Sequence, residues 1–408
     1  MKKMGDFNGA VSLVSGRLDI PSLTGLRFFA AFFILLNHLL LGFVSRDTAL
    51  FGRLLANSAF LGMDIFFVLS GFIIHYNYSV KINGSLKKFY AFFVARFSRL
   101  YPLFVATFVI DFLLVARGSN VSWPDMLRAI PFFITMSQSW FYQLTSTGAT
   151  LYYMFPRASI TWSVSTEMLM YAFYPLLWYW LVKVRSFSFK ITGLLTVFTI
   201  LVLSVIFKSL YVNEAFFDRL GVSIFGDISS VARSPEFSFS FWVWYVSPYS
   251  RLLQFMCGIA VADYCLKHVD RALDYSETTF VKIGQVLAFL YVFGTFLPQK
   301  YAITLFDEIF QMFGYAPIVC FCIYYCYVNP VGRFSKLLST NWCVKLGERS
   351  YSIYIWHIYF YAFVVMLPGA RFLHVVIAWV GIYIFSAISY EWLEKPLRQR
   401  IRKLLSWA

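Results

Sequence analysis

Residues 22–44 read SLTGLRFFAAFFILLNHLLLGFV, and this stretch decides the class of fold. It is almost wholly apolar, and Arg27 is its one permanently charged side chain. A helix needs about 20 mostly apolar residues to cross the hydrocarbon core of a bilayer. Because the stretch is long enough and lacks a clear cleavage pattern, we predict a retained transmembrane helix rather than a cleaved signal peptide.

The composition of the rest of the chain agrees with a membrane protein. Of its 408 residues 60% are hydrophobic and 21% aromatic, whereas only 13% are charged. Soluble domains average about 25% charged residues. The net charge of +15 does not indicate a nucleic-acid binder, because the basic residues form short clusters between apolar runs rather than one stripe. The cysteines form no CxxC pair and the histidines lack metal-ligand spacing, so we expect no metal.

Hydrophobic runs of spanning length predict an all-α, polytopic transmembrane helical bundle with about ten spans. We place the spans at 22–44, 58–79, 89–115, 160–182, 189–210, 246–266, 279–297, 304–328, 346–367 and 372–393. A shorter apolar piece at 129–141 is broken by Pro131, so we expect it to be interfacial or re-entrant. If it did span, the number of spans would change and the argument for the orientation would be weaker.

Lys and Arg favour cytoplasmic loops, and their distribution predicts that both termini are cytoplasmic. With the N-terminus inside, every inside segment has at least three basic residues once the adjoining span ends are included. We therefore predict a cytoplasmic N-terminal segment at 1–21, a transmembrane domain at 22–395 and a basic cytoplasmic tail at 396–408. The predicted location is the cytoplasmic (inner) membrane, which the chain crosses several times.

Ionisable side chains inside apolar spans are costly and point to function. Arg27 and His38 are eleven residues apart, so a helix carries them within about 20° of one face and about 16 Å apart along its axis. His38, Asp64 and Glu167 each fall in the outer third of a predicted span. An imidazole with carboxylates is what a general base and its charge-balancing partner require.

Arg96 and Arg99 lie three residues apart at the inner end of the third predicted span and are therefore neighbours on a helix face. Paired guanidinium groups suit phosphate oxygens. The same two residues are also explained by the positive-inside rule or by contact with anionic lipid.

Six stretches resemble, in order, the motifs of the acyltransferase-3 family of integral membrane acyltransferases. Arg27 and His38 fit its Arg-(ten residues)-His pattern, and ARFSRLYP at 95–102 fits its Arg-x-x-Arg motif. The other four stretches are FLGMDIFFVLSGFII at 60–74, TWSVSTEMLMY at 161–171, LGERSYSIYIWH at 346–357 and YEWLEKPLRQR at 390–400. The family often has two consecutive acidic residues in the fourth-span motif, whereas Met168 follows Glu167 here.

The resemblance implies an O-acyltransferase that moves an acyl group from cytoplasmic acyl-CoA to a hydroxyl of a cell-surface or exported saccharide. The expected acyl group is acetyl, and the expected donor is therefore acetyl-CoA. His38, Asp64 and Glu167 would be catalytic. Arg27, Arg96 and Arg99 would bind the phosphates of the donor. The expected partners are membrane lipid and a saccharide acceptor at the outer face, without nucleic acid. Composition alone would also suit a secondary transporter or a carrier of a lipid-linked glycan.

Overall fold

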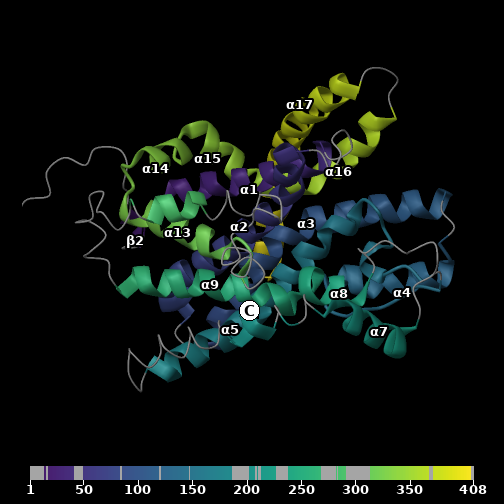
Figure 1. Ribbon diagram of the computed structural model, residues 1–408, viewed down its shortest axis with the longest axis horizontal. Helices are drawn as coiled ribbons and strands as arrows, with labels where there is room; N and C mark the ends of the chain where they lie inside the picture. The colour runs from purple at the N-terminus through teal and green to yellow at the C-terminus, as the bar shows by residue number, and fades with distance from the viewer. Residues whose placement is uncertain are drawn as a thin grey trace, which may run out of the picture. The chain divides into compact units, whose positions relative to one another are not determined.

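The structure is a computed structural model of the chain, drawn in Figure 1. It describes residues 13–14, 17–40, 49–82, 85–118, 121–146, 148–185, 202–206, 209, 213–226, 238–267, 282, 284–290, 313–366 and 371–405. The chain divides into two compact units: unit 1 is Met1–Tyr76 with Cys257–Tyr354, and unit 2 is Asn77–Met256 with Ile355–Ala408. The predicted span 189–210 and the first part of 304–328 lie largely outside the described residues.

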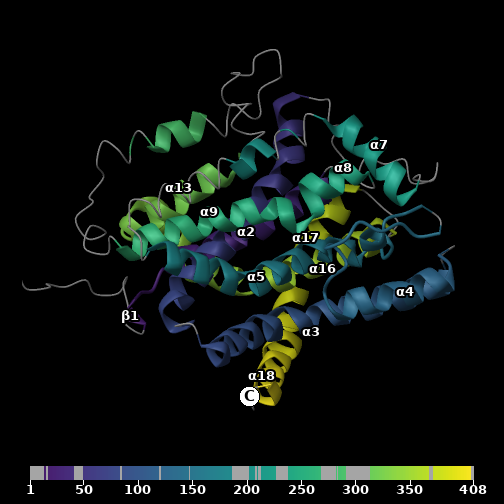
Figure 2. The same ribbon diagram turned by 90° about the horizontal axis from the view of Figure 1, so that it is seen from below.

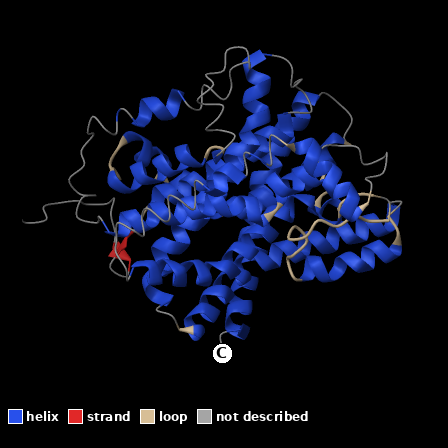
Figure 3. Ribbon diagram, turned by 60° about the horizontal axis from the view of Figure 1, so that its bottom comes forward, coloured by secondary structure: helices blue, strands red, loops and turns tan. Residues whose placement is uncertain are grey.

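The described residues are almost entirely helical, which confirms the all-α prediction (Figure 3). The exception is an antiparallel pair of two-residue strands, β1 (Leu13–Val14) and β2 (Arg17–Leu18). A helix satisfies its backbone hydrogen bonds internally, so it is the element expected of a chain this apolar.

Four helices in the described ranges are long and apolar enough to cross a membrane: Pro21–Leu40, Asn57–Ile82, Leu86–Gly118 and Leu373–Leu405. They correspond to the first, second, third and last predicted spans. Residues 129–141 contain only the end of α4 (Trp123–Ile134), which has 12 residues and is too short to span. The remaining predicted spans and the orientation of the termini stay predictions.

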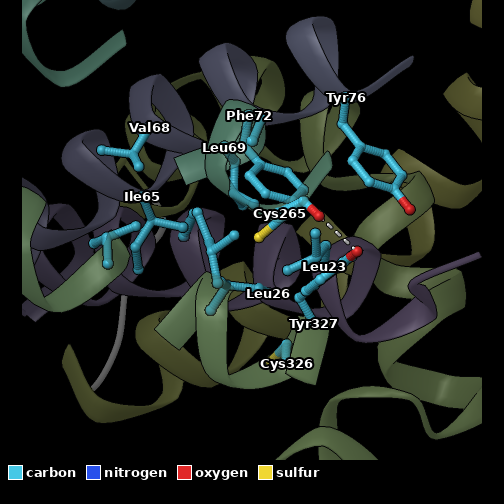
Figure 4. Packing of buried hydrophobic residues seen from close by; sticks show 14 of the residues in the cluster. Leu23, Leu26, Ile65, Val68, Leu69, Phe72, Tyr76, Cys265, Cys326 and Tyr327 are labelled. Atoms are coloured by element: carbon cyan, nitrogen blue, oxygen red, sulfur yellow. Dashed lines mark hydrogen bonds between the residues drawn. The ribbon is translucent and has the colours of Figure 1, made fainter. Parts of the chain in front are cut away.

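Unit 1 is built from α1 (Pro21–Leu40), the first part of α2 (Ala49–Ile82), the end of α9 (Pro248–Lys267), α13 (Ala316–Val328), α14 (Arg333–Leu338), α15 (Asn341–Glu348) and the start of α16 (Ser350–Val365). Its core joins α1, α2, α9 and α13. Figure 4 shows Leu23 and Leu26 of α1 with Ile65 and Leu69 of α2 among the packed side chains. The hydroxyl of Tyr327 donates to the carbonyl oxygen of Cys265 at 2.9 Å, which satisfies the polar end of a buried ring.

Glycines allow α1 to approach its neighbours very closely. Figure 1 shows α1 beside α14 and α15. A Cβ atom on Gly25 would lie 2.0 Å from the carbonyl oxygen of Leu338, and one on Gly347 would lie 1.9 Å from that of Thr24. Such short distances are possible only without a side chain, so these two glycines set the spacing between the helices.

Unit 2 is built around α3 (Leu86–Gly118) and α5 (Trp162–Arg185), which pack together. The other helices are α4, η1 (Leu151–Tyr153), η2 (Ala158–Thr161), α7 (Glu214–Phe225), α8 (Phe239–Phe241), the π-helical η5 (Trp242–Val246) and η7 (Tyr390–Glu394), α17 (Arg371–Ser389) and α18 (Lys395–Leu405), with parts of α2, α9 and α16. α17, η7 and α18 follow one another without a break, and α18 contacts α3 (Figure 2).

Gly347→Ala is expected to destabilise the protein. Overpacking a tight contact costs about 1–3 kcal/mol, which exceeds the roughly 1 kcal/mol that alanine gains over glycine in helix propensity. We expect a lower midpoint of thermal unfolding for the detergent-purified protein. Gly118→Ala is the control, because a Cβ at Gly118 meets nothing within 4 Å. An unchanged midpoint for Gly347→Ala would contradict the close approach of α15 to α1.

Candidate active site

Arg27 and His38 both lie on α1, which runs unbroken from Pro21 to Leu40. The eleven-residue spacing is therefore a spacing along one helix, as predicted. Both side chains are partly buried. The neighbour of His38, Asn37, donates from Nδ2 to the carbonyl oxygen of Leu55 at 2.6 Å and ties this end of α1 to α2.

The register between α1 and α2 separates Asp64 from His38. Asn37 contacts Leu55, and Gly62 lies against the carbonyl oxygen of Ala30. The two helices are thus antiparallel, and Asp64 comes level with residues 28–30 of α1. His38 is about nine residues farther along, which is roughly 14 Å at 1.5 Å per residue. The prediction that His38 and Asp64 share one depth is wrong, because span boundaries read from hydropathy do not fix the register.

Asp64 holds a turn of the backbone. Its side chain is 2% exposed, and its Oδ2 accepts a hydrogen bond from the backbone N–H of Tyr315 at 2.7 Å. Gly314, just before, has φ +57°, and a Cβ there would lie 2.5 Å from the same carboxylate oxygen. The carboxylate therefore anchors the turn that begins α13, and glycine is required for both the conformation and the space.

Glu167 lies in unit 2 beside an aromatic and basic cluster. The hydroxyl of Tyr171, one turn later on α5, donates to Oε1 of Glu167. The ring of Tyr171 contacts that of Phe92 on α3, with centroids 6.3 Å apart. The guanidinium of Arg96 lies 5.9 Å from the centroid of Phe92. A continuous set of contacts thus connects the carboxylate to α3.

The hydroxyl of Tyr171 lies within the electrostatic influence of three charged groups. These are the carboxylate of Glu167 and the guanidinium groups of Arg96 and Arg99. Arg96 also stacks over Tyr78, 5.0 Å from the ring centroid, and its Nε is buried without a hydrogen-bond partner. Neither arginine forms an ion pair with any residue that the structure describes. A buried donor without a partner is unusual, and it fits a site for an anionic ligand.

These contacts change one part of the predicted arrangement. We expected Glu167 on the outer side, away from Arg96 and Arg99. In unit 2 the carboxylate, the phenol of Tyr171 and both guanidinium groups instead belong to one cluster. Tyr171 ends the TWSVSTEMLMY stretch, and its role could have been read from its spacing of four from Glu167.

The hydroxyls of the same stretch anchor the loop after α4. Ser139 donates to Oγ of Ser165 at 2.9 Å, and Trp140 donates from its ring nitrogen to the carbonyl oxygen of Ser165 at 2.9 Å. Thr166 donates to the carbonyl oxygen of Val246 at 3.0 Å. These bonds hold the first turns of α5 against the loop after α4 and against η5, and Glu167 directly follows Thr166.

Asp111 is a buried acid that the sequence reasoning missed. It is fully buried in α3, and its Oδ2 accepts from the backbone N–H groups of Arg157 and Ala158 at 2.8 and 2.9 Å. Nη1 of Arg157 lies 3.4 Å from Oδ1. The signal was present, because Asp111 is an acid within an apolar run.

The buried His75 belongs to a partly buried ionic cluster in unit 1. Its Nε2 lies 3.4 Å from Oδ1 of Asp263, and Lys267 pairs with the other carboxylate oxygen. His357, in unit 2, is fully buried, and its neighbour Trp356 donates to Oγ of Ser389 at 2.8 Å. Among the described residues no three His, Cys, Asp or Glu side chains gather as a metal site.

Comparison with known proteins gives a match along nearly the whole chain. A family model described as an acyltransferase domain matches residues 20–391. A Staphylococcus aureus (strain COL) protein named "Putative O-acetyltransferase" is 24% identical over 401 residues, which are 95% of this chain and 59% of that protein. The S. aureus (strain NCTC 8325) O-acetyltransferase OatA is 25% identical over 410 residues, 97% of this chain and 60% of OatA. The chain thus spans about three fifths of these relatives. No solved structure matches significantly.

Asp111→Asn is expected to lower the free energy of unfolding by about 3 kcal/mol, since it weakens buried charged hydrogen bonds and leaves Arg157 without its partner. Glu391→Gln is the matched control. Glu391 forms an ion pair with Lys395, and the two side chains are 44% and 53% exposed, respectively. Exposed ion pairs contribute at most about 1 kcal/mol to stability. Unfolding of both variants in mixed detergent measures the difference, and equal losses would contradict a structural role for Asp111.

Proposed function

The chain belongs to the acyltransferase-3 family, and from this premise we propose that it is an O-acyltransferase of the cytoplasmic membrane. The proposed donor is acetyl-CoA on the cytoplasmic side. The proposed acceptor is a hydroxyl group of an exported or cell-surface saccharide. The names of the relatives support O-acetyl transfer. The proposed donor and saccharide rest on the family resemblance, and the proposed membrane face rests on the distribution of basic residues.

The observation that carries the proposal is the cluster of Arg96, Arg99, Tyr171 and Glu167 in unit 2. Two guanidinium groups without a carboxylate partner among the described residues suit the phosphates of coenzyme A. Arg27 is proposed as a further donor-side cation. A phenol and a carboxylate next to this anion site supply groups that can hold or accept a proton.

The proposed reaction is direct transfer. The acceptor hydroxyl oxygen attacks the carbonyl carbon of the thioester, and His38 takes the hydroxyl proton as the new C–O bond forms. The C–S bond breaks, and the thiolate of coenzyme A leaves and takes up a proton. Glu167 stays proposed as a catalytic carboxylate, within the cluster of unit 2 that contains Tyr171, Arg96 and Arg99. A two-step route through an acyl-enzyme gives the same overall balance.

Asp64 has a different proposed role from the one its sequence position suggested. Its carboxylate already accepts the Tyr315 N–H and is 2% exposed. We therefore propose that Asp64 positions the turn before α13, and that it supports the reaction through the shape of unit 1 rather than by proton transfer.

His38→Ala is expected to lower acetyl transfer by about 10²–10⁴-fold, the usual contribution of a general base. The measurement is transfer from radiolabelled acetyl-CoA in membranes that contain equal amounts of folded protein. His374→Ala is the control for loss of a buried histidine. Wild-type rates for His38→Ala would remove His38 from the mechanism.

Arg96→Gln and Arg99→Gln are each expected to weaken coenzyme A binding by roughly 10- to 100-fold, since a hydrogen bond to a charged group contributes about 1.5–3 kcal/mol. Equilibrium binding to the purified protein measures the loss, with the exposed Arg117→Gln at the far end of α3 as control. A secondary transporter would show no thioester-dependent acetylation, and coenzyme A binding would not depend on these arginines.

A further inference from the structure

The C-terminal helix brings a second set of basic side chains to the arginines of α3. α18 (Lys395–Leu405) contains Lys395, Arg398, Arg400, Arg402 and Lys403. It contacts α3, as Figure 2 shows with α18 in yellow and α3 in blue. Two cationic segments far apart in the sequence therefore lie side by side within unit 2.

Arg398 is the residue of α18 on which the charge of Arg99 acts, and Arg402 lies on the same face of the helix as Arg398. They are four residues apart and so neighbours on the helix, whereas Arg400 lies about 200° from Arg398. The positive charges of Arg99 and Arg402 both act on the guanidinium of Arg398. Arg398 is half-buried, while Arg402 and Arg400 are exposed.

Among the described residues, the carboxylates associated with this cluster are Glu167, which accepts a hydrogen bond from Tyr171, and Glu391 and Glu394 directly before the C-terminal helix. Glu391 pairs with Lys395. Glu394 is 2% exposed, and its negative charge acts on the guanidinium of Arg398. Four guanidinium groups have no carboxylate within ion-pair distance in the part of the chain that the structure describes. They belong to Arg96, Arg99, Arg398 and Arg402. Like charges so arranged repel one another unless an anion lies between them.

We propose that Arg398 and Arg402 of α18 join Arg96 and Arg99 of α3 in one binding site for phosphate groups. Guanidinium groups bind phosphate oxygens through paired N–H donors, and four of them suit a ligand with more than one phosphate. The buried Nε of Arg96 supplies a donor that has no protein partner. The C-terminal helix is thus part of the ligand site, and its basic residues do more than set the membrane orientation.

Two ligands share this chemistry: the phosphates of coenzyme A and the headgroup of an anionic lipid. Coenzyme A follows if the proposed function is correct, and this assignment of the ligand rests on that function. The phosphate site itself rests on the arrangement of the four arginines. The two ideas can therefore fail separately.

The test compares Arg398→Gln with Arg400→Gln, which removes the same charge from the same helix on another face. The protein is held in phosphatidylcholine nanodiscs at low salt, and coenzyme A is the titrated probe. We expect Arg398→Gln to weaken binding about tenfold or more and the exposed Arg402→Gln about threefold. Arg400→Gln should stay within twofold of wild type, and added salt should reduce the difference between the variants.

A second arm uses vesicles with and without phosphatidylglycerol to measure lipid binding by the same variants. If the wild type ignores coenzyme A but Arg398→Gln loses binding to phosphatidylglycerol, the phosphate site stands and the proposed donor is wrong. If the wild type binds coenzyme A and Arg398→Gln matches Arg400→Gln in both arms, the site is wrong and the proposed function is untouched.

Folding is controlled with a third variant. Arg398→Lys keeps the charge but loses the paired donors, so we expect an intermediate affinity with the unfolding midpoint of wild type. If Arg398→Gln fails to fold, the test relies on Arg398→Lys. Wild-type affinity of Arg398→Lys for both coenzyme A and phosphatidylglycerol would then overturn the proposal.

Discussion

A charged or polar group inside an apolar helical chain must find a partner, because neither lipid nor a packed core replaces the hydrogen bonds of water. This requirement explains the partners of three acids in the structure, of which Asp64 and Asp111 are buried and Asp263 is partly buried. Asp64 accepts the backbone N–H that begins α13. Asp111 accepts two N–H groups at the start of η2 and faces Arg157. Asp263 lies between His75 and Lys267. Each acid is thereby committed to holding one segment to another.

The arginines of α3 and α18 stand apart from this pattern. They gather without a carboxylate partner among the described residues, next to the hydrogen-bonded pair of Glu167 and Tyr171. A structural role alone does not account for charges that repel one another. An anion bound between them would reduce this repulsion, and this is the basis for our proposal of a phosphate site in unit 2.

Precise positioning of Glu167 depends on groups that look unremarkable in the sequence. Ser165 and Thr166 connect α5 to the loop after α4 and to η5 through buried hydrogen bonds. Phe92 fills the space between Tyr171 and Arg96. In unit 1, Gly25 and Gly347 set the distance of α1 from α14 and α15. The TWSVST and LGERS stretches thus contain residues that hold the chemical groups in place.

The sequence by itself determined the helical class, the membrane character and the family, because apolar length, residue spacing and six ordered motifs are local properties of the chain. It also placed Arg27 and His38 on one helix. Only the tertiary structure showed that His38 and Asp64 lie at different levels along their helices, since helix register depends on close contacts such as that of Gly62 with Ala30. Likewise, it brought Glu167 to Arg96 and Arg99, and α18 to α3, because side-chain packing between distant segments leaves no periodic signal in the sequence.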